Sequence, residues 1–299
     1  MNDFLSVADM APSELIEVLD KAAAVKKDPT AAAGALSGKS IGLFFQKPSA
    51  RTRISTEVGA AELGMTPIVL KADEIGLGKR EAVSDVGKVF DRYLDALAFR
   101  VFSHDDLVTL ADNAEAPVIN LLSDLEHPCQ ALADLQTVAE TRPLPETVLT
   151  YVGDGNNVAH SLMLAGAMAE MEIRIATPPG YEPADSVLAA ANAFAGSVAV
   201  TNDVSEAVND AHVVYTDVWA SMGQESQAQE RKKLFMQYQV NREVFDRAAD
   251  GAIFLHCLPA HRGDEATDDV LDHARSRIFD QAENRLHSFK ALLLHTFGR

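Results

Sequence analysis

The sequence predicts an α/β fold: two doubly wound domains with mostly parallel sheets, and an active site in the cleft between them. Its 299 residues favour two domains, because one domain usually takes about 100 to 200 residues. Short apolar runs alternate along the chain with apolar residues at helical spacing, as in parallel βα units. Unusual polar residues follow several of the apolar runs, at the sheet edge where such folds bind ligands.

The first half of the chain indicates an opening helix followed by alternating strands and helices. The opening helix starts at Pro12, a residue favoured in the first helical turn, and carries early acids that the helix dipole favours. The apolar helix faces are Leu15, Leu19 and Ala22, then Ile54, Val58 and Ala61, then Val86, Phe90 and Tyr93. The predicted strands are 41–45, 68–70, 97–102 and 118–122. This order predicts one parallel sheet covered by helices.

A polar stretch with two prolines, 137–146, marks the predicted domain boundary, which we place near residue 143. The first domain is then expected over 1–142 and the second over 143–281. A new series of predicted strands follows at 148–152, 173–176, 198–200, 213–218 and 253–258. The stretch 219–238 has no clear period and is rich in Gln, Ser and Glu, so we expect a lid or a binding loop there.

The composition and charge exclude several classes of function. Apolar residues make up 47% of the chain and charged residues 23%, which is ordinary for a folded globular protein. The 44 acidic and 26 basic residues give a net charge of −18, which opposes general binding to nucleic acid or to anionic membranes. An anionic ligand would therefore need a local basic site.

The sequence also predicts the compartment. No apolar run approaches the roughly 18 residues of a membrane span, and the start Met-Asn-Asp lacks the basic and apolar segments of a signal peptide. The two cysteines, Cys129 and Cys257, cannot form a disulfide framework. We therefore expect a soluble, cytoplasmic protein with neither nucleic acid nor membrane as a partner.

A predicted phosphate cradle follows the first strand. The segment 49–52, Ser-Ala-Arg-Thr, lies where a helix begins. Free backbone N–H groups, the positive end of the helix dipole and two hydroxyls meet there beside Arg51 and Arg53. The simpler alternative is a helix cap with solvated arginines, which a Ser-x-Arg-x-Arg pattern taken alone would favour.

Two further patterns suggest a cofactor or a metal but fail in detail. Gly153-Asp-Gly-Asn-Asn-Val lacks the third glycine of the dinucleotide-binding fingerprint, so a nucleotide site is not expected. His256 and His261 look like a metal-binding pair, but no third ligand follows at a recognised spacing. We predict neither a cofactor nor a metal.

Four segments carry a resemblance to a known family. They are Phe45-Gln-Lys-Pro-Ser-Ala-Arg-Thr-Arg, His127-Pro-Cys-Gln, Asp217-Val-Trp-Ala-Ser-Met-Gly-Gln-Glu and His256-Cys-Leu-Pro-Ala-His-Arg-Gly. Together they resemble the aspartate/ornithine carbamoyltransferase family, and the Ser-Met-Gly and His-Cys-Leu-Pro elements resemble its ornithine branch. The resemblance implies transfer of a carbamoyl group from carbamoyl phosphate to the δ-amine of L-ornithine. The products would be L-citrulline and phosphate, as in arginine biosynthesis.

The resemblance also implies the site residues. Those for carbamoyl phosphate are Ser49, Ala50, Arg51, Thr52, Gly76, Arg100, His127, Gln130, Cys257, Leu258 and Arg285, and those for ornithine are Asn157, Asp217, Ser221 and Met222. Arg100, His127, Asp217 and Cys257 would be the catalytic residues. The last helix, 282–299, would pack back on the first domain, and the chain would form a homotrimer or a multiple of trimers.

The implied roles follow the charges of the substrates. Arg100 would bridge the phosphate and the carbonyl oxygen, and His127 would polarise that carbonyl. Asp217 would pair with the α-ammonium of ornithine. The δ-amine, whose ordinary pKa is about 10.4, must be neutral to attack, and Cys257 with the carbonyl of Leu258 would hold it. Taken alone, His127, Asp217 and Cys257 could also be a helix cap, a turn residue and a buried core cysteine.

Two departures from the family leave alternatives open. Family members usually have Thr at the position of Ala50 and often Gln at that of Gly76, so the affinity for carbamoyl phosphate is open, with Lys79 or Arg80 available to compensate. The chain could carbamoylate another amine, such as aspartate, putrescine or an acyl-ornithine, or bind carbamoyl phosphate without catalysis. The sequence does not set the direction of flux or the assembly beyond a trimer, nor whether the acidic charge reflects a high-salt cytoplasm.

Overall fold

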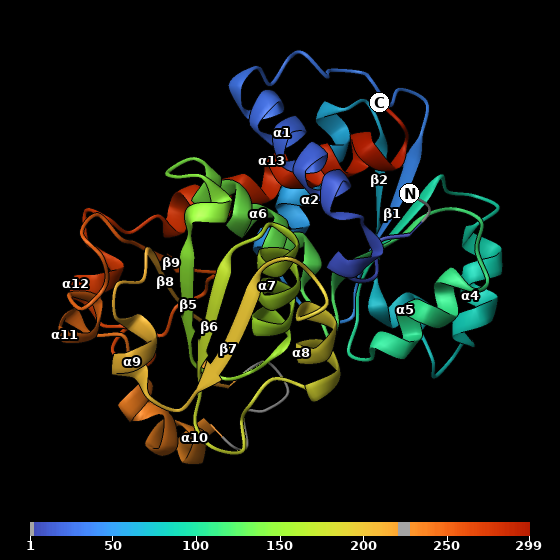
Figure 1. Ribbon diagram of the computed structural model, residues 1–299. Helices are drawn as coiled ribbons and strands as arrows, with labels where there is room; N and C mark the ends of the chain where they lie inside the picture. The colour runs from blue at the N-terminus through green and yellow to red at the C-terminus, as the bar shows by residue number, and fades with distance from the viewer. Residues whose placement is uncertain (1–2, 221–227) are drawn as a thin grey trace. The chain divides into compact units, whose positions relative to one another are not determined.

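The computed structural model describes residues 3–220 and 228–299 and divides into two compact units (Figure 1). Unit 1 contains Met1–Gln136 and Glu283–Arg299, and unit 2 contains Thr137–Ala282. The division falls within helix α6 (Pro128–Ala139), whereas the sequence suggested a boundary near residue 143. Because the end of the chain belongs to unit 1, that unit is discontinuous in sequence.

Unit 1 is built on a four-stranded parallel sheet in the order β2-β1-β3-β4. The strands are β1 (Ser40–Phe45), β2 (Thr66–Leu70), β3 (Ala96–Arg100) and β4 (Val118–Leu122). Its helices are η1 (Val7–Asp9), α1 (Pro12–Lys27), α2 (Ala50–Glu62), α3 (Ala72–Ile75), α4 (Val83–Phe90), α5 (His104–Ala111), most of α6, and most of α13 (Ile278–Thr296). Phe45 at the end of β1 pairs with Arg100 at the end of β3, so these strands end at the same level.

The central strands of unit 1 are buried along their whole length. Every residue of β3 and β4 is buried, as expected for parallel strands covered by helices on both faces. In the core, the rings of Phe44 and Phe99 lie 4.9 Å apart between their centroids. Helix α1 begins with Pro12 and buries a single apolar face, which includes Leu15 and Leu19.

Unit 2 has a five-stranded parallel sheet in the order β7-β6-β5-β8-β9. The strands are β5 (Val148–Val152), β6 (Glu172–Ala176), β7 (Ser197–Thr201), β8 (Val213–Thr216) and β9 (Ile253–His256). The helices are η2 (Leu144–Glu146), α7 (Asn157–Met168), α8 (Asp185–Ala191), α9 (Val204–Val208), α10 (Ala228–Phe235), η4 (Met236–Tyr238), α11 (Arg242–Phe245) and α12 (Asp268–Leu271). Residues 158–168 of α7 are all buried, which agrees with their apolar composition.

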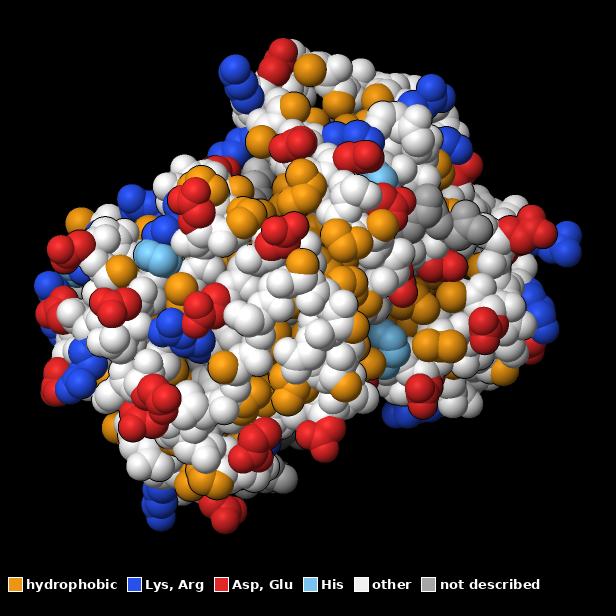
Figure 2. Space-filling model, viewed as in Figure 1, with side chains coloured by type: hydrophobic (Ala, Val, Ile, Leu, Met, Phe, Trp, Pro, Cys, Tyr) orange, Lys and Arg blue, Asp and Glu red, His pale blue; other side chains and the backbone are white. Residues whose placement is uncertain are grey.

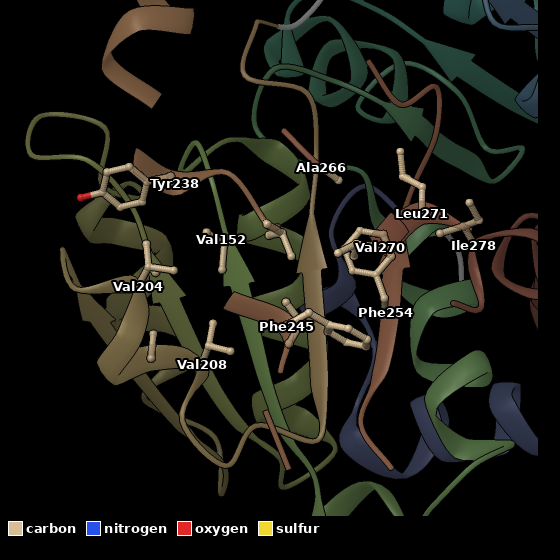
Figure 3. Packing of buried hydrophobic residues seen from close by; sticks show 14 residues of the cluster. Val152, Val204, Val208, Tyr238, Phe245, Phe254, Ala266, Val270, Leu271 and Ile278 are labelled. Atoms are coloured by element: carbon tan, nitrogen blue, oxygen red, sulfur yellow. The ribbon is translucent and has the colours of Figure 1, made fainter. Parts of the chain in front are cut away.

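A buried apolar cluster packs strands of unit 2 against its shorter helices (Figure 3). Val152 and Phe254 come from the sheet, Phe245 from α11 and Val270 from α12. Fully burying each side chain of this size contributes roughly 1.5–3 kcal/mol. Tyr238 of η4 joins the cluster, and its hydroxyl donates to the carbonyl of Asn202 at 2.8 Å. The end of the stretch 219–238 is thereby anchored in the core.

The predicted fold class is confirmed, because both units are α/β with parallel sheets. Strand ends differ slightly, since β3 ends at Arg100 and β8 ends at Thr216. Tyr93 lies beyond the end of α4 and is 73% exposed, so it does not belong to that helix face. The stretch 219–238 is not a continuous loop, because α10 and η4 occupy its second half. Helix α10 buries a charged residue, Arg231, together with Phe235, so its buried face is not purely apolar.

The surface reflects the mixed charge of the chain. Acidic and basic side chains are interspersed over the face seen in Figure 2, without one continuous basic area. Among the helices that the structure describes, none combines the length and the apolar character needed to cross a bilayer.

Candidate active site

Each sheet has a central strand from which the chain continues first to one side and later to the other, and several of the predicted site residues follow the strands at that point. In unit 1, β1 lies between β2 and β3, and in unit 2, β5 lies between β6 and β8. Ligands of open parallel sheets bind beyond the carboxyl ends of such strands. The loop after β1 is joined to the end of β3, because the N–H of Gln46 donates to Arg100 O and Gln46 Oε1 accepts the N–H of Phe102, both at 2.8 Å.

The first turn of α2 forms the core of the unit 1 site. Ser49 is the N-cap, and its Oγ accepts the N–H of Thr52 at 3.4 Å. The Ser49 hydroxyl also donates to Thr52 Oγ1 at 3.0 Å. Ala50 and Arg51 are exposed on this turn, whereas Thr52 is buried. The free N–H groups of a helix start and its dipole attract an anion at such a turn.

Arg285 of α13 connects this turn to α6. Its Nη1 donates to Gln130 Oε1 in a short hydrogen bond, and its Nη2 donates to Thr52 Oγ1 at 3.4 Å. Gln130 in turn donates through Nε2 to Asp134 Oδ1 at 2.7 Å. Three predicted residues that are far apart in the sequence thus form one hydrogen-bonded group, which holds a guanidinium at the start of α2.

His127 lies directly before α6 and is only 6% exposed. Burial, the nearby Arg285 and the nearby Arg100 together hold the pKa of the His127 imidazole well below its usual range. The ring is therefore neutral at physiological pH and can donate a hydrogen bond without adding charge. Arg100, at the end of β3, is also buried, with 8% of its surface exposed. We call Ser49, Thr52, Arg100, His127, Gln130 and Arg285 the unit 1 site.

Gly76 takes no part in the hydrogen bonds among Thr52, Gln130 and Arg285 in the part of the chain that the structure describes. It ends α3 in the left-handed conformation, with φ of 62°. A Cβ atom at Gly76 would lie 2.7 Å from Cβ of Arg80. A glutamine, which the family resemblance leads one to expect here, would therefore require a different turn.

In unit 2, Asp217 follows β8 and joins the ends of three strands. It is 5% exposed, and its Oδ2 accepts a hydrogen bond from Asn156 Nδ2 at 3.3 Å. Asn156 is the N-cap of α7, with Oδ1 accepting the N–H groups of Val158 and Ala159. The predicted Asn157 is the first residue of that helix.

Cys257 follows β9, and its thiol donates to Asp217 Oδ1 at 2.9 Å. The next residue, Leu258, has the left-handed φ of 57°, and its N–H donates to Nδ1 of His256 at 2.9 Å. The other ring nitrogen of His256, Nε2, lies 3.1 Å from Oε1 of the buried Glu265. Because Nδ1 accepts, Nε2 must carry the proton and donate. We call Asn157, Asp217, Cys257 and Leu258 the unit 2 site.

One group of side chains has the donor types of a metal site. Within residues 3–220 and 228–299, Asp217, His256 and Cys257 bring ligand atoms within 4.8 Å of one another. Both ring nitrogens of His256 and the thiol of Cys257 already form the hydrogen bonds described above. A metal would have to replace those bonds, so the absence of a metal requirement stays our prediction.

Three further residues named in the sequence analysis are not part of the site geometry described above. Ser221 and Met222 lie outside the described residues. Cys129 is a buried thiol that hydrogen-bonds to the carbonyl of Asn120, and burial raises its pKa to about 12. It therefore stays protonated and unreactive.

Sequence reasoning missed three residues that hold the unit 2 site together. Asn156 supports Asp217, Glu265 supports His256, and the buried Arg231 of α10 contacts Asp154 on the loop after β5. A cap-forming Asn before an apolar helix is a signal that could have identified Asn156. Glu265 and Arg231 have no local signal, because acidic and basic residues are mostly solvent-exposed.

Profiles of two domains of one family match nearly the whole chain. The profile described as "Aspartate/ornithine carbamoyltransferase, carbamoyl-P binding domain" matches residues 2–140. The profile described as "Aspartate/ornithine carbamoyltransferase, Asp/Orn binding domain" matches residues 146–296.

Curated relatives and solved structures agree with these profiles. The ornithine carbamoyltransferase of Acidothermus cellulolyticus is 50% identical over 295 residues, which are 97% of this chain and 95% of the relative. The protein named "Ornithine carbamoyltransferase, anabolic" of Pyrococcus furiosus is 50% identical over 268 residues, 88% of this chain and 85% of the relative. A solved ornithine carbamoyltransferase from Pyrococcus furiosus has a TM-score of 0.96 at 46% identity, covering 99% of this chain and 97% of that one. The chain therefore belongs to the aspartate/ornithine carbamoyltransferase family.

Proposed function

We propose that this chain transfers the carbamoyl group of carbamoyl phosphate to the δ-amine of L-ornithine, releasing L-citrulline and phosphate. The observation that carries the proposal is the hydrogen-bonded group of Thr52, Gln130 and Arg285 at the start of α2, close to a neutral His127. The relatives that are half identical to this chain bear the name ornithine carbamoyltransferase.

Carbamoyl phosphate binds through its phosphate to the first turn of α2. The backbone N–H groups of this turn, including that of Ala50, face the anion with the hydroxyl of Ser49 and the guanidinium of Arg51. Thr52 Oγ1 accepts from both Ser49 and Arg285, so its own proton is available to a phosphate oxygen. The turn at Gly76 completes the predicted set as a contributor to a neighbouring subunit's site.

The carbonyl of the carbamoyl group is activated by neutral and charged donors. Arg100 bridges the phosphate and the carbonyl oxygen and stabilises negative charge as the carbon becomes tetrahedral. Arg285 keeps Gln130 in place by a hydrogen bond, and the side chain of Gln130 orients the carbamoyl group. His127 donates to the carbonyl oxygen, which its lowered pKa permits without adding to the positive charge of Arg100 and Arg285.

Ornithine binds at the carboxyl ends of β8 and β9. Asp217 receives its α-ammonium, with Asn157, Ser221 and Met222 around the amino-acid backbone. The neutral δ-amine contacts Cys257 and the carbonyl of Leu258 and attacks the carbamoyl carbon. The C–N bond forms as the carbon becomes tetrahedral, the C–O bond to phosphate then breaks, and the departing phosphate takes the proton that the amine loses. The thiol of Cys257 donates a hydrogen bond to Asp217 and keeps its proton. Cys257 therefore suits a polar contact with the amine better than a role as covalent nucleophile.

Citrulline formation from carbamoyl phosphate and ornithine tests this proposal directly. Ornithine, aspartate, putrescine and N-acetylornithine should be compared at equal concentrations, with ornithine giving by far the highest kcat/KM. Higher turnover with another amine would show that this amine is the acceptor, while carbamoyl transfer would remain the reaction. Saturable binding of carbamoyl phosphate with no product from any amine would instead indicate a noncatalytic binding protein.

We further propose a homotrimer in the cytoplasm that works in arginine biosynthesis. Exposed apolar residues on α2 (Ile54, Val58) and on the edge strand β2 (Ile68, Val69) support a subunit interface on unit 1. The free cysteines suit a reducing compartment. Light scattering should give three times the 32.2 kDa chain mass, and loss of the gene should create a requirement for citrulline or arginine.

A further inference from the structure

We propose that Arg231 is a positioning residue for ornithine, because it holds together the loops that follow β5 and β8. This inference rests on the proposed function, since it assigns Arg231 to the site that binds the acceptor amine. No local pattern singles out this residue, which lies on α10 among other charged side chains.

Arg231 is buried and makes two contacts through one nitrogen. Only 8% of the residue is exposed. Its Nη1 donates to Asp154 Oδ2 at 2.6 Å and to the carbonyl oxygen of Trp219 at 2.9 Å. Asp154, itself 8% exposed, lies on the loop after β5, and Trp219 lies two residues after Asp217. One guanidinium therefore joins two loops at the carboxyl edge of the sheet.

Both residues that Arg231 contacts through Nη1, Asp154 and Trp219, are close to Asp217 along the chain or through one hydrogen-bonded neighbour. On one side, the N–H of Asn156 lies 2.7 Å from the carbonyl of Asp154, and Asn156 donates through its side chain to Asp217. On the other side, Trp219 is 4% exposed, which fixes the backbone close behind Asp217. A change at Arg231 would thus be transmitted to the carboxylate that receives the α-ammonium.

Aromatic side chains fix the guanidinium in this place. The Cζ atom of Arg231 lies 4.9 Å from the ring centroid of Tyr181, within the range of a cation–π contact. The Tyr181 ring packs edge-on against Phe235 with centroids 5.0 Å apart, and Phe235 lies 6.0 Å from Trp219. The carbonyl of Tyr181 accepts the N–H of Gly155, which ties the same loop to this group.

Arg231 also sets the charge of the site. Burial raises the pKa of the Asp154 carboxyl, the nearby Asp217 raises it further, and the contact with Arg231 opposes both effects. With Asp154 compensated by Arg231, Asp217 is the carboxylate that remains for a cationic ligand. Because Arg231 and Asp154 balance each other's charge, the site favours one ammonium group, at Asp217.

The experiment compares Arg231→Met, Arg231→Lys and the double variant Arg231→Met/Asp154→Asn with the wild type. We expect Arg231→Met to raise the KM for ornithine about tenfold or more, as for the loss of charged hydrogen bonds. The KM for carbamoyl phosphate should stay unchanged and kcat should fall less than threefold. Arg231→Lys, which keeps a cationic donor, should recover part of the ornithine affinity.

The double variant keeps the test valid if Arg231→Met fails to fold, because it removes both buried charges together. We expect it to fold and to keep the raised KM for ornithine, since Trp219 still lacks its donor. A double variant with the wild-type KM would overturn the positioning role and leave Arg231 as a charge partner only. Lys232→Met, on the same helix, breaks an exposed pair with Asp264 and should leave both KM values unchanged.

Titration calorimetry with ornithine separates this inference from the proposed function. If the wild type binds ornithine but forms no citrulline, the proposed reaction fails while the variants still report on Arg231. If the wild type turns over ornithine and a folded Arg231→Met has the same KM, only the role of Arg231 fails. A wild type that neither binds ornithine nor turns it over would overturn both.

Discussion

The unit 1 and unit 2 sites use the same structural feature for opposite charges. Each lies beyond the carboxyl end of a central strand, β1 or β5, of a parallel sheet. A helix with a polar N-cap begins there. In unit 1, Ser49 caps α2, and Arg285 donates to Thr52 in the same turn. In unit 2, Asn156 caps α7 and holds the carboxylate of Asp217.

The difference shows how one backbone arrangement can bind either sign of charge. A helix N-terminus favours an anion in both units. In unit 1 the nearby arginines suit an external phosphate, whereas in unit 2 the anion is the protein's own Asp217, which can then receive a cation. The net charge of −18 does not predict which charge either site binds, because binding depends on the charges close to the ligand.

The largest effect should come from removing the cation at the end of β3. We expect Arg100→Met to lower kcat/KM for carbamoyl phosphate by about a thousandfold, because a buried donor to the transition state is lost. Steady-state citrulline formation measures this. Arg242→Met is the matched control, since Arg242 is half exposed, lies outside both sites and pairs with Asp246 only four residues away. A loss below tenfold in Arg100→Met would remove Arg100 from the catalytic residues.

A smaller effect should follow from neutralising the unit 2 site. We expect Asp217→Asn to raise the KM for ornithine about a hundredfold while the KM for carbamoyl phosphate stays the same, because the anion that receives the ammonium is lost. Initial rates with each substrate varied in turn measure this. Asp264→Asn, which breaks a more exposed ion pair of unit 2, serves as the control. Equal rises in both KM values would mean that Asp217 has a general structural role.

The neutral His127 of unit 1 predicts a dependence of stability on pH. Its pKa is lowered on folding, so below about pH 6.5 the unfolded chain binds one more proton than the folded chain. The free energy of unfolding should therefore decrease on acidification by about 1.4 kcal/mol per pH unit from this residue.

Urea unfolding of the wild type and His127→Gln between pH 5.5 and 7.5, a range chosen to span about pH 6.5, checks this prediction. The remaining histidines are the same in both proteins, so the difference in slope isolates His127. Parallel pH profiles would show that His127 takes up a proton equally well in the folded state.

The smallest effect should come from restoring the residue that the family usually has in the α2 turn. We expect Ala50→Thr to lower the KM for carbamoyl phosphate about fivefold, because a hydroxyl adds one hydrogen bond to the phosphate. Ala50→Val, with a similar shape and no hydroxyl, is the control. An equal change in both variants would assign the effect to packing or helix propensity instead of to the hydroxyl.

Much of the fold could be predicted from local patterns. The buried strands β3 and β4 are continuous apolar runs, and the start of α1 has Pro12 and early acids, so local rules suffice for both. The residue spacing was less informative for α10, whose buried face includes Arg231. An ion pair with Asp154 replaces apolar burial there, and no periodicity signals it.

The sequence alone determined the alternation of strands and helices and the polar residues that follow the strands. These features depend on side-chain type and short-range spacing, which the chain carries locally. Tertiary structure decided which of those residues meet. Arg285 reaches Thr52 and Gln130 across 233 and 155 positions, and Arg231 reaches Asp154 across 77. Such contacts depend on the packing of whole elements, because a buried charge is stable only where the folded chain supplies its partner.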